Sequence, residues 1–484
     1  MKKFVFIFFL ISNLLVFSQV DYSDSWEDFY SYNNVKDFVK VDNIIYALAD
    51  NAVFTFNENT TEIEKFSSIQ GLSGETTSSI YYNSTFKRLV IGYENGLVEV
   101  IDEDGVITIS SDIVNFNQSG QKSINHISES GNTLYLSTPF AIVEYDIEKL
   151  EFGDTFFIGD GSTSLKINQT LIVDDIIYAA TEDGIFNADV TSDLLIDFNN
   201  WEQQLNRIDF SKISFFNDKF YVAEGSRLHE LVNGTLRLTE DFFEIISGLH
   251  VTENYLAISL VKNAVILDSS ENRFTAFSTT SNFDYTLSNV IFENNTVYLA
   301  TKEFGILKTT TSNSSEFEEI HPEGPLENDV FSIEVNNNNL WVVYGGYDIT
   351  YTPIQKRQGF SHFNGENWLN TPFNRDFPVI DLNHISIDPN AENRVYISSF
   401  GDTNDINSVS TGGLLVVEND EIKVFLNHLN SGLEDLAPNQ PNRVTLRISG
   451  TVFDKQGNLW VANISDNDEL KKLSISGQWS SFNI

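Results

Sequence analysis

An internal repeat constrains this sequence more than any other feature. A short apolar stretch around one anchor residue, as in residues 45–54, returns many times along the chain. The anchors of its ten copies are Tyr46, Ile91, Tyr135, Tyr178, Tyr221, Ala257, Tyr298, Trp341, Tyr396 and Trp460. A period of about 40–45 residues with four short strands per unit is typical of β-propeller blades, so we predict an all-β propeller.

The turns inside the repeats support this interpretation. Asn95-Gly96 and Asp183-Gly184 each separate two apolar stretches, and such dipeptides tolerate the positive φ angles of a tight hairpin. The apolar residues alternate with a period of two, which argues against helical solenoids. A parallel β-helix is the rival fold, but its repeats are shorter and lack these hairpin turns.

Ten repeats are too many for one ring, since propellers usually have about 4–8 blades. The spacing lengthens after Trp341, and insertions appear at residues 401–413 and 430–442. We therefore expect one complete seven-bladed propeller in residues 19–325, followed by about three blades of a second, incomplete propeller in residues 326–484. Three blades cannot close a ring, so further sequence or a partner would have to cover their exposed edges.

The segment before the first repeat resembles part of a blade. Residues 26–32 are similar to residues 478–482, which we expect to form an outer strand. We predict that residues 26–32 form an N-terminal outer strand that pairs with the last blade and closes the first ring. An ordinary lead-in strand is the alternative.

Residues 1–18 are typical of a secretory signal peptide. Lys2 and Lys3 precede a mostly apolar stretch, and the small residue Ser18 lies just before the expected cleavage site. The stretch is shorter than the roughly 20 apolar residues of a membrane-spanning helix. We expect export to the periplasm, with Gln19 as the first mature residue and no membrane span in the mature chain.

Charge and composition argue against several functions. The chain has 29 Lys and Arg against 69 Asp and Glu, which gives a formal net charge of −40. Because phosphate backbones attract basic proteins, this charge predicts no nucleic-acid partner. The absence of cysteine excludes disulfides, thiolate catalysis, cysteine-bound zinc and a lipid-modified N-terminal cysteine.

No motif of a known catalytic site is present. The sequence lacks a nucleophile elbow, a zinc-protease motif and a phosphate-binding loop, and its seven histidines are scattered. We therefore predict no enzyme activity, no catalytic residues and no cofactor, and ligand-binding residues stay open. Two acidic loops are weak calcium candidates, with solvated loops as the alternative: Asp402 with Asp405, and Asp466 with Asp468.

A few basic and aromatic residues are candidates for ligand contact. An anionic ligand can approach three basic pairs, although solvated strand ends are the alternative: Lys87-Arg88, Lys356-Arg357 and Lys471-Lys472. Four tryptophans lie in expected outer strands or loops, where packing between blades is favoured over stacking on sugars: Trp26, Trp201, Trp368 and Trp479.

Two parts of the sequence resemble a known family. Residues 26–37 are similar to the mature start of the PorZ family, a component of the Bacteroidetes type IX secretion system, and residues 69–97 resemble its first blades. Residues 451–461 resemble the propellers of two-component regulators, a motif shared by many proteins.

The PorZ resemblance implies two seven-bladed propellers followed by a C-terminal β-sandwich. It further implies a non-enzymatic protein on the outer-membrane surface, in a complex with PorU, PorV and PorQ. Such a protein binds anionic lipopolysaccharide and presents it to the sortase PorU. The sequence departs from this pattern because it ends after the tenth repeat, and no family binding motif maps onto its residues.

Two other functions stay open at this point. One is the extracellular sensor propeller of a hybrid two-component regulator, which would continue into a membrane helix and a kinase. The other is a polysaccharide-active propeller enzyme, which would need acids or histidines gathered at one mouth of the ring.

Overall fold

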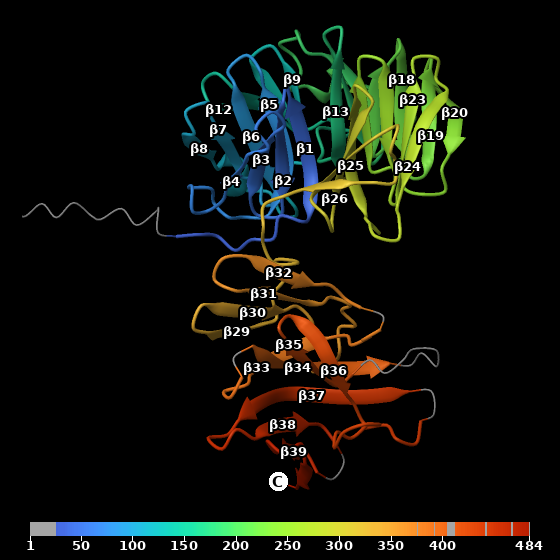
Figure 1. Ribbon diagram of the computed structural model, residues 1–484. Helices are drawn as coiled ribbons and strands as arrows, with labels where there is room; N and C mark the ends of the chain where they lie inside the picture. The colour runs from blue at the N-terminus through green and yellow to red at the C-terminus, as the bar shows by residue number, and fades with distance from the viewer. Residues whose placement is uncertain are drawn as a thin grey trace, which may run out of the picture.

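The chain folds almost entirely into antiparallel β-sheets (Figure 1). The computed structural model describes residues 26–374, 376–391, 393–403, 412–440, 443–465 and 468–483. The described helical segments are the short α2 (Asp112–Asn115) and η3 (Phe198–Asn200). The predicted all-β propeller class is confirmed, whereas the predicted signal peptide lies outside the described residues.

Seven four-stranded sheets succeed one another along the first part of the described chain, and in each the strands follow in chain order. The first three contain β1 (Val35–Val41), β2 (Ile44–Ala49), β3 (Val53–Asn57), β4 (Ile63–Phe66); β5 (Thr77–Asn83), β6 (Arg88–Tyr93), β7 (Val98–Ile101), β8 (Ile107–Ser110); β9 (His126–Ser130), β10 (Thr133–Ser137), β11 (Ile142–Asp146) and β12 (Glu151–Phe156). The next two contain β13 (Ile167–Val173), β14 (Ile176–Thr181), β15 (Gly184–Asp189), β16 (Glu202–Gln204); β17 (Lys212–Phe216), β18 (Lys219–Glu224), β19 (Arg227–Val232) and β20 (Thr235–Asp241). The last two contain β21 (Gly248–Thr252), β22 (Tyr255–Ser259), β23 (Asn263–Asp268), β24 (Arg273–Ser278); β25 (Leu287–Glu293), β26 (Thr296–Thr301), β27 (Ile306–Thr310) and β28 (Glu318–Ile320).

The second part of the chain is drawn in orange and red below this ring in Figure 1. One sheet contains β29 (Ser332–Asn336), β30 (Asn339–Val343), β31 (Phe360–Phe363) and β32 (Trp368–Thr371). A larger sheet contains β33 (Leu382–Ile387), β34 (Arg394–Thr403), β35 (Leu414–Glu418), β36 (Glu421–Leu426), β37 (Val444–Phe453), β38 (Leu459–Asn463), β39 (Leu470–Leu473) and β40 (Trp479–Phe482). The ends of β34 and β37 pair with each other, from Phe400↔Arg447 to Thr403↔Val444. The two insertions noted in the sequence therefore border a ribbon that joins two four-stranded groups.

Neighbouring blades are joined by side chains near the start of the innermost strands. Lys36 Nζ donates to the backbone carbonyl of Thr77 in the next blade (2.7 Å). Ser78, Asn125 and Asn168 make the equivalent bond to the following blade, to the carbonyls of Ile124 (2.8 Å), Ile167 (2.8 Å) and Phe210 (2.9 Å). Lys36, Ser78 and Asn168 each stand at a β-bulge, which re-aims a side chain out of the regular ladder. Each bond satisfies a backbone acceptor at a blade boundary.

The first and last blades of the ring meet through polar side chains. Asn289 Nδ2 donates to Asp37 Oδ1 (2.7 Å), and Tyr298 OH donates to Glu58 (2.6 Å). Lys308 forms an ion pair with Glu58 at 2.8 Å. These contacts join β1 and the first blade to β25, β26 and β27 of the seventh.

An apolar cluster crosses the same boundary. Its buried members from the start of the ring include Tyr32, Phe38 and Phe54, and those from the seventh blade include Tyr298 and Ile306. The rings of Tyr32 and Phe54 meet edge to face, with their centroids 5.9 Å apart, which is a favourable arrangement for two aromatic side chains. The ring therefore closes by packing between its two ends.

The prediction of an outer strand over residues 26–32 is wrong. Residues 26–34 form no strand, and β28 already supplies the outer strand of the seventh sheet. The segment instead runs between the ring and the second part, where Ser31 N donates to Asn328 Oδ1 (2.7 Å) and Gly305 N donates to Asn33 O (2.8 Å). The aromatic pattern that resembled an outer strand serves packing, because Tyr32 is fully buried.

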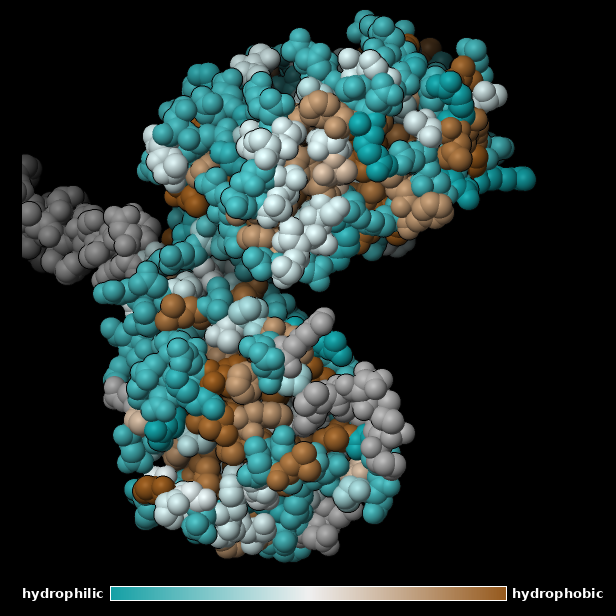
Figure 2. Space-filling view, turned by 45° about the vertical axis from the view of Figure 1, so that its right-hand side comes forward, coloured by the Kyte–Doolittle hydropathy of each residue, from teal (hydrophilic) through white to brown (hydrophobic). Residues whose placement is uncertain are grey.

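Apolar sheet faces remain uncovered in the second part. Ile333 and Val335 of β29 are 56% and 58% exposed, and Val452 of β37 is 64% exposed. Figure 2 shows hydrophobic side chains gathered on the surface of this lower part. Among the described residues, no helix has the length and apolar character needed to cross a membrane.

Candidate functional site

The lumen of the first ring is a polar cavity and a candidate binding site. It has a volume of about 500 Å³. Its walls come from the innermost strand of every blade, namely β1, β5, β9, β13, β17, β21 and β25. Ligand pockets commonly have volumes of roughly 300–1,000 Å³, so the lumen is large enough for a small molecule.

One residue of each inner strand lies at the same level of this lumen. Each of these residues pairs with the same position of the second strand of its blade. Examples are Asp37 with Leu48, Gln169 with Ala180 and Asn289 with Ala300. We call this set the lumen ring: Asp37, Ser79, His126, Gln169, Lys212, Gly248 and Asn289. All of its members except the glycine carry a polar side chain.

Two ring members of opposite charge are Asp37 and Lys212. Asp37 Oδ1 accepts hydrogen bonds from Asn289 Nδ2 (2.7 Å) and from the backbone N–H of Phe38 (2.9 Å). Burial raises the pKa of Asp37, while these bonds and the charge of Lys212 oppose the rise. Burial lowers the pKa of Lys212, and the charge of Asp37 opposes that shift. Among the described residues, the Lys212 ammonium makes no hydrogen bond or ion pair.

Two histidines in the lumen are neutral at physiological pH. Burial lowers the pKa of His126 to about 3, with a smaller contribution from Lys212 in the same direction. Burial also lowers the pKa of His250 to about 4. Other charged residues of the lining are already bonded: Lys36 to the carbonyl of Thr77, and Glu129 to Tyr81 (3.0 Å). Among the charged residues of the lining, Lys212 is thus the one for which no hydrogen bond or ion pair with a described residue is found.

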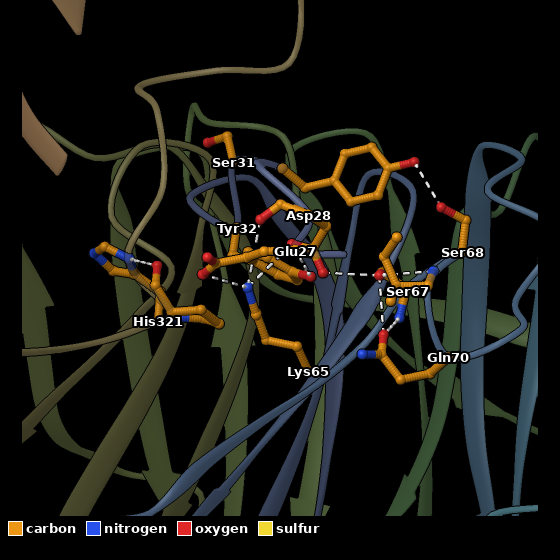
Figure 3. A network of polar contacts seen from close by, with 12 residues as sticks. Glu27, Asp28, Ser31, Tyr32, Lys65, Ser67, Ser68, Gln70 and His321 are labelled. Atoms are coloured by element: carbon orange, nitrogen blue, oxygen red, sulfur yellow. Dashed lines mark hydrogen bonds and ion pairs between the residues drawn. The ribbon is translucent and has the colours of Figure 1, made fainter. Parts of the chain in front are cut away.

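A second polar cluster anchors the N-terminal segment, residues 26–34 (Figure 3). Asp28 accepts hydrogen bonds from Tyr32 OH (3.1 Å) and Ser67 Oγ (2.8 Å) and forms an ion pair with Lys65 (3.3 Å). Ser67 N donates to Gln70 Oε1 (2.9 Å). These bonds fix the segment to the first blade, so this cluster positions the chain.

The comparisons with known proteins bear on the same part of the chain. A family model described as the type IX secretion system PorZ, N-terminal β-propeller domain, matches residues 45–202. Residues 45–202 are therefore similar to a PorZ N-terminal β-propeller domain. The fold extends the likeness beyond that domain, as the solved structures indicate.

One solved structure is similar over almost the whole chain. It is described as PorZ, an essential bacterial surface component of the type IX secretion system of Porphyromonas gingivalis. The TM-score is 0.78 at 19% sequence identity, and the match covers 95% of this chain and 60% of that one. The chain thus spans about 60% of the length of that PorZ, and the likeness establishes the fold.

Other matches are more distant. The extracellular domain of the putative hybrid two-component system BT3049 from B. thetaiotaomicron has a TM-score of 0.47 at 14% identity, covering 94% of this chain and 65% of that one. This likeness carries no argument about function. The search of curated proteins found no match.

Of the predicted calcium candidates, Asp402 is engaged with basic side chains. It forms ion pairs with Arg443 (2.6 Å) and Arg447 (2.9 Å) and accepts a hydrogen bond from Thr445 (3.0 Å). Burial opposes ionisation of Asp402, but these bonds lower its pKa overall. Its carboxylate therefore already has cationic partners from the protein.

The other calcium candidates are only partly described. Asp405 and Asp466 lie outside the described residues, whereas Asp468 lies within them. Among the described residues, no group of three or more His, Asp or Glu is arranged to hold a metal. Calcium binding at either loop stays a prediction.

One lysine of each predicted basic pair is engaged with the protein. Lys87 pairs with Glu103 (2.7 Å), and Lys356 pairs with Asp329 (2.8 Å). Lys471 is fully buried and pairs with Glu434 (2.6 Å). Of the four tryptophans, Trp201 is buried and donates to Leu195 O (2.9 Å), which agrees with packing.

The lumen ring was missed by reasoning from single motifs. Asp37, His126 and Lys212 are far apart in the sequence and belong to no shared motif. A signal exists in the repeats themselves, because each of these residues occupies the same position relative to its blade. Aligning the inner strands by their pairing with the second strand of each blade places the three in one column.

Proposed function

We propose that this chain is a surface component of a type IX secretion system and acts there as a non-enzymatic binding scaffold. The observation that carries the proposal is the PorZ N-terminal propeller domain at residues 45–202, together with a PorZ-like fold over 95% of the chain. The similar solved protein is described as an essential surface component of that system. A propeller suits this role, because its rigid ring presents loops and a lumen to partners.

The proposed ligand is an anionic lipopolysaccharide, which the protein presents to the sortase PorU in a complex with PorV and PorQ. The signal peptide would direct the chain to the periplasm, and the complex would hold it at the outer-membrane surface. This location can be tested by treating intact cells with a protease. A surface protein is digested in intact cells, whereas a periplasmic one is protected until the outer membrane is opened.

A binding experiment tests the ligand and the partner separately. The purified full chain is mixed with anionic lipopolysaccharide and, as a matched control, with lipopolysaccharide from a strain that lacks the anionic polysaccharide. We expect a mobility shift with the first preparation alone, and capture of PorU by the immobilised chain. Absence of both interactions would reject the scaffold role.

A further inference from the structure

Lys212 lines the lumen of the first ring, and its ammonium group makes no hydrogen bond or ion pair with a described residue. Lys212 is half-buried at the first position of β17, and no described residue bonds to its Nζ atom. The charge of Asp37 acts on Lys212 without an ion pair between them, and an anionic group in direct contact with the ammonium adds a favourable interaction. The lumen therefore favours a ligand with one negative group.

The blade that follows Lys212 contributes no side chain at the level of the lumen ring. The next blade contributes Gly248 to the lumen ring, so no side chain extends into the lumen from that position. A Cβ atom at Gly248 would lie 2.9 Å from Asn289 Oδ1 and 3.0 Å from Ser259 Oγ, closer than ordinary contact. Glycine therefore permits the close packing of this wall against Asn289 and Ser259.

The remaining ring groups need partners that both donate and accept hydrogen bonds. Asp37 uses Oδ1 for its two protein bonds, and no bond from a described residue reaches Oδ2. Gln169 accepts from the backbone N–H of Ile213 through Oε1 (3.3 Å), which leaves its NH₂ group for the lumen. Hydroxyl groups can donate to a carboxylate and accept from an amide at the same time.

We propose that the lumen ring binds a small acidic sugar, with its carboxylate at Lys212 and its hydroxyls at Asp37 and Gln169. The cavity of about 500 Å³ suits a sugar unit of this size. The ring carries one cation and one anion, so a ligand that has both an acidic group and donors for Asp37 matches it better than a bare anion does. This site is independent of the proposed lipopolysaccharide and PorU interactions.

Calorimetry with the full chain tests the ligand class with three probes. D-glucuronate carries the carboxylate and the hydroxyls, D-glucose carries the hydroxyls alone, and acetate carries the carboxylate alone. We expect saturable heat with glucuronate and at least about tenfold weaker binding of the other two. Equal binding of glucose or acetate, or no binding of glucuronate at millimolar concentration, overturns the proposal.

Substitution then locates the site. Lys212→Gln is expected to weaken glucuronate binding at least about tenfold, since it removes the charge but keeps a polar side chain. Lys149→Gln is the matched control, because Lys149 is an exposed lysine paired with Asp146 outside the lumen. Unchanged binding by the Lys212→Gln protein would place the ligand elsewhere and overturn the proposal.

A measurement on the unsubstituted protein covers the case in which Lys212→Gln does not fold. Lysines are acetylated with acetic anhydride in the presence and absence of glucuronate, and the modified positions are read by mass spectrometry. We expect glucuronate to slow modification of Lys212 and to leave Lys149 unchanged. Equal modification of Lys212 with and without the sugar contradicts the proposal.

Discussion

Single polar side chains connect the blades at their inner edges. The bonds from Lys36, Ser78, Asn125 and Asn168 to the next blade's carbonyls repeat around the first ring, and Asn383 makes the same bond to Ile448 O (2.8 Å) in the second part. Asn383 is 3% exposed and also accepts from Ser398 Oγ (3.1 Å). A buried carbonyl that loses its donor is costly, so each such bond contributes to the stability of its blade boundary.

Replacing Asn383 tests this role. Asn383→Ala leaves the carbonyl of Ile448 and the hydroxyl of Ser398 without this bond. We therefore expect the free energy of unfolding to fall by about 1–3 kcal/mol. The measurement is urea unfolding monitored by tryptophan fluorescence. The fluorescence reports mainly on the second part, which contains four of the six tryptophans: Trp341, Trp368, Trp460 and Trp479. Asn59→Ala, at an exposed turn position, should change the midpoint little. Equal effects of the two substitutions would contradict this account.

The lumen histidines predict a dependence of stability on pH. The pKa of His126 is about 3 in the folded protein, below its ordinary value of 6.5. His126 is therefore protonated at a higher pH in the unfolded chain than in the folded protein. Its contribution to stability is fully present above about pH 6.5 and is lost as the pH falls toward 3. His126→Gln should make the unfolding midpoint less sensitive to pH between about 6.5 and 4. An unchanged slope in thermal unfolding across this range would show that His126 makes no such contribution.

At the scale of elements, the repeated hairpins were predictable and the connections between them were not. The Asn95-Gly96 and Asp183-Gly184 turns adopt the expected positive φ, with Gly96 at 90° and Gly184 at 101°. Their local chemistry fixes their shape, so the sequence alone predicts them. Residues 26–32 have the alternation of a strand, but contacts with Asn328 and Gly305 far along the chain decide their path. The lumen ring could not be predicted for the same reason, since it exists only once the ring is closed.

Phe29 links the N-terminal segment to the second part of the molecule. The centroid of its ring lies 4.8 Å from the ring centroid of Phe363 and 5.4 Å from that of Trp368. Aromatic pairs contribute about 0.5–1.5 kcal/mol each, so Phe29→Ala should loosen this contact. We expect faster cleavage by a glutamate-specific protease at the exposed Glu323 in the connecting segment.

Trp26→Ala provides the control for that experiment. Trp26 is 69% exposed, and no ring contact to it is found in the described part of the chain. Its removal should leave the cleavage rate close to that of the parent protein. Similar acceleration by both substitutions would mean that the segment as a whole, rather than the Phe29 contact, controls access.

At the scale of the whole molecule, the net charge of −40 works against an anionic ligand. Like charges repel over about 8–10 Å at physiological ionic strength, so binding of an anionic lipopolysaccharide requires cations that bridge the two surfaces. We expect Mg²⁺ or Ca²⁺ to strengthen the interaction and EDTA to weaken it by at least about tenfold. Titration of lipopolysaccharide into the full chain, with and without EDTA, measures this effect. Binding that is unchanged by EDTA would indicate a local basic site instead.

The most direct measurement of the central claim is made in the source bacterium. The gene for this chain is deleted, and attachment of anionic lipopolysaccharide to secreted cargo is followed by gel mobility and surface labelling. The account predicts that cargo loses its lipopolysaccharide and leaves the cell surface, and that the native gene restores both. Normal modification and retention of cargo in the deletion strain would contradict a role in type IX secretion.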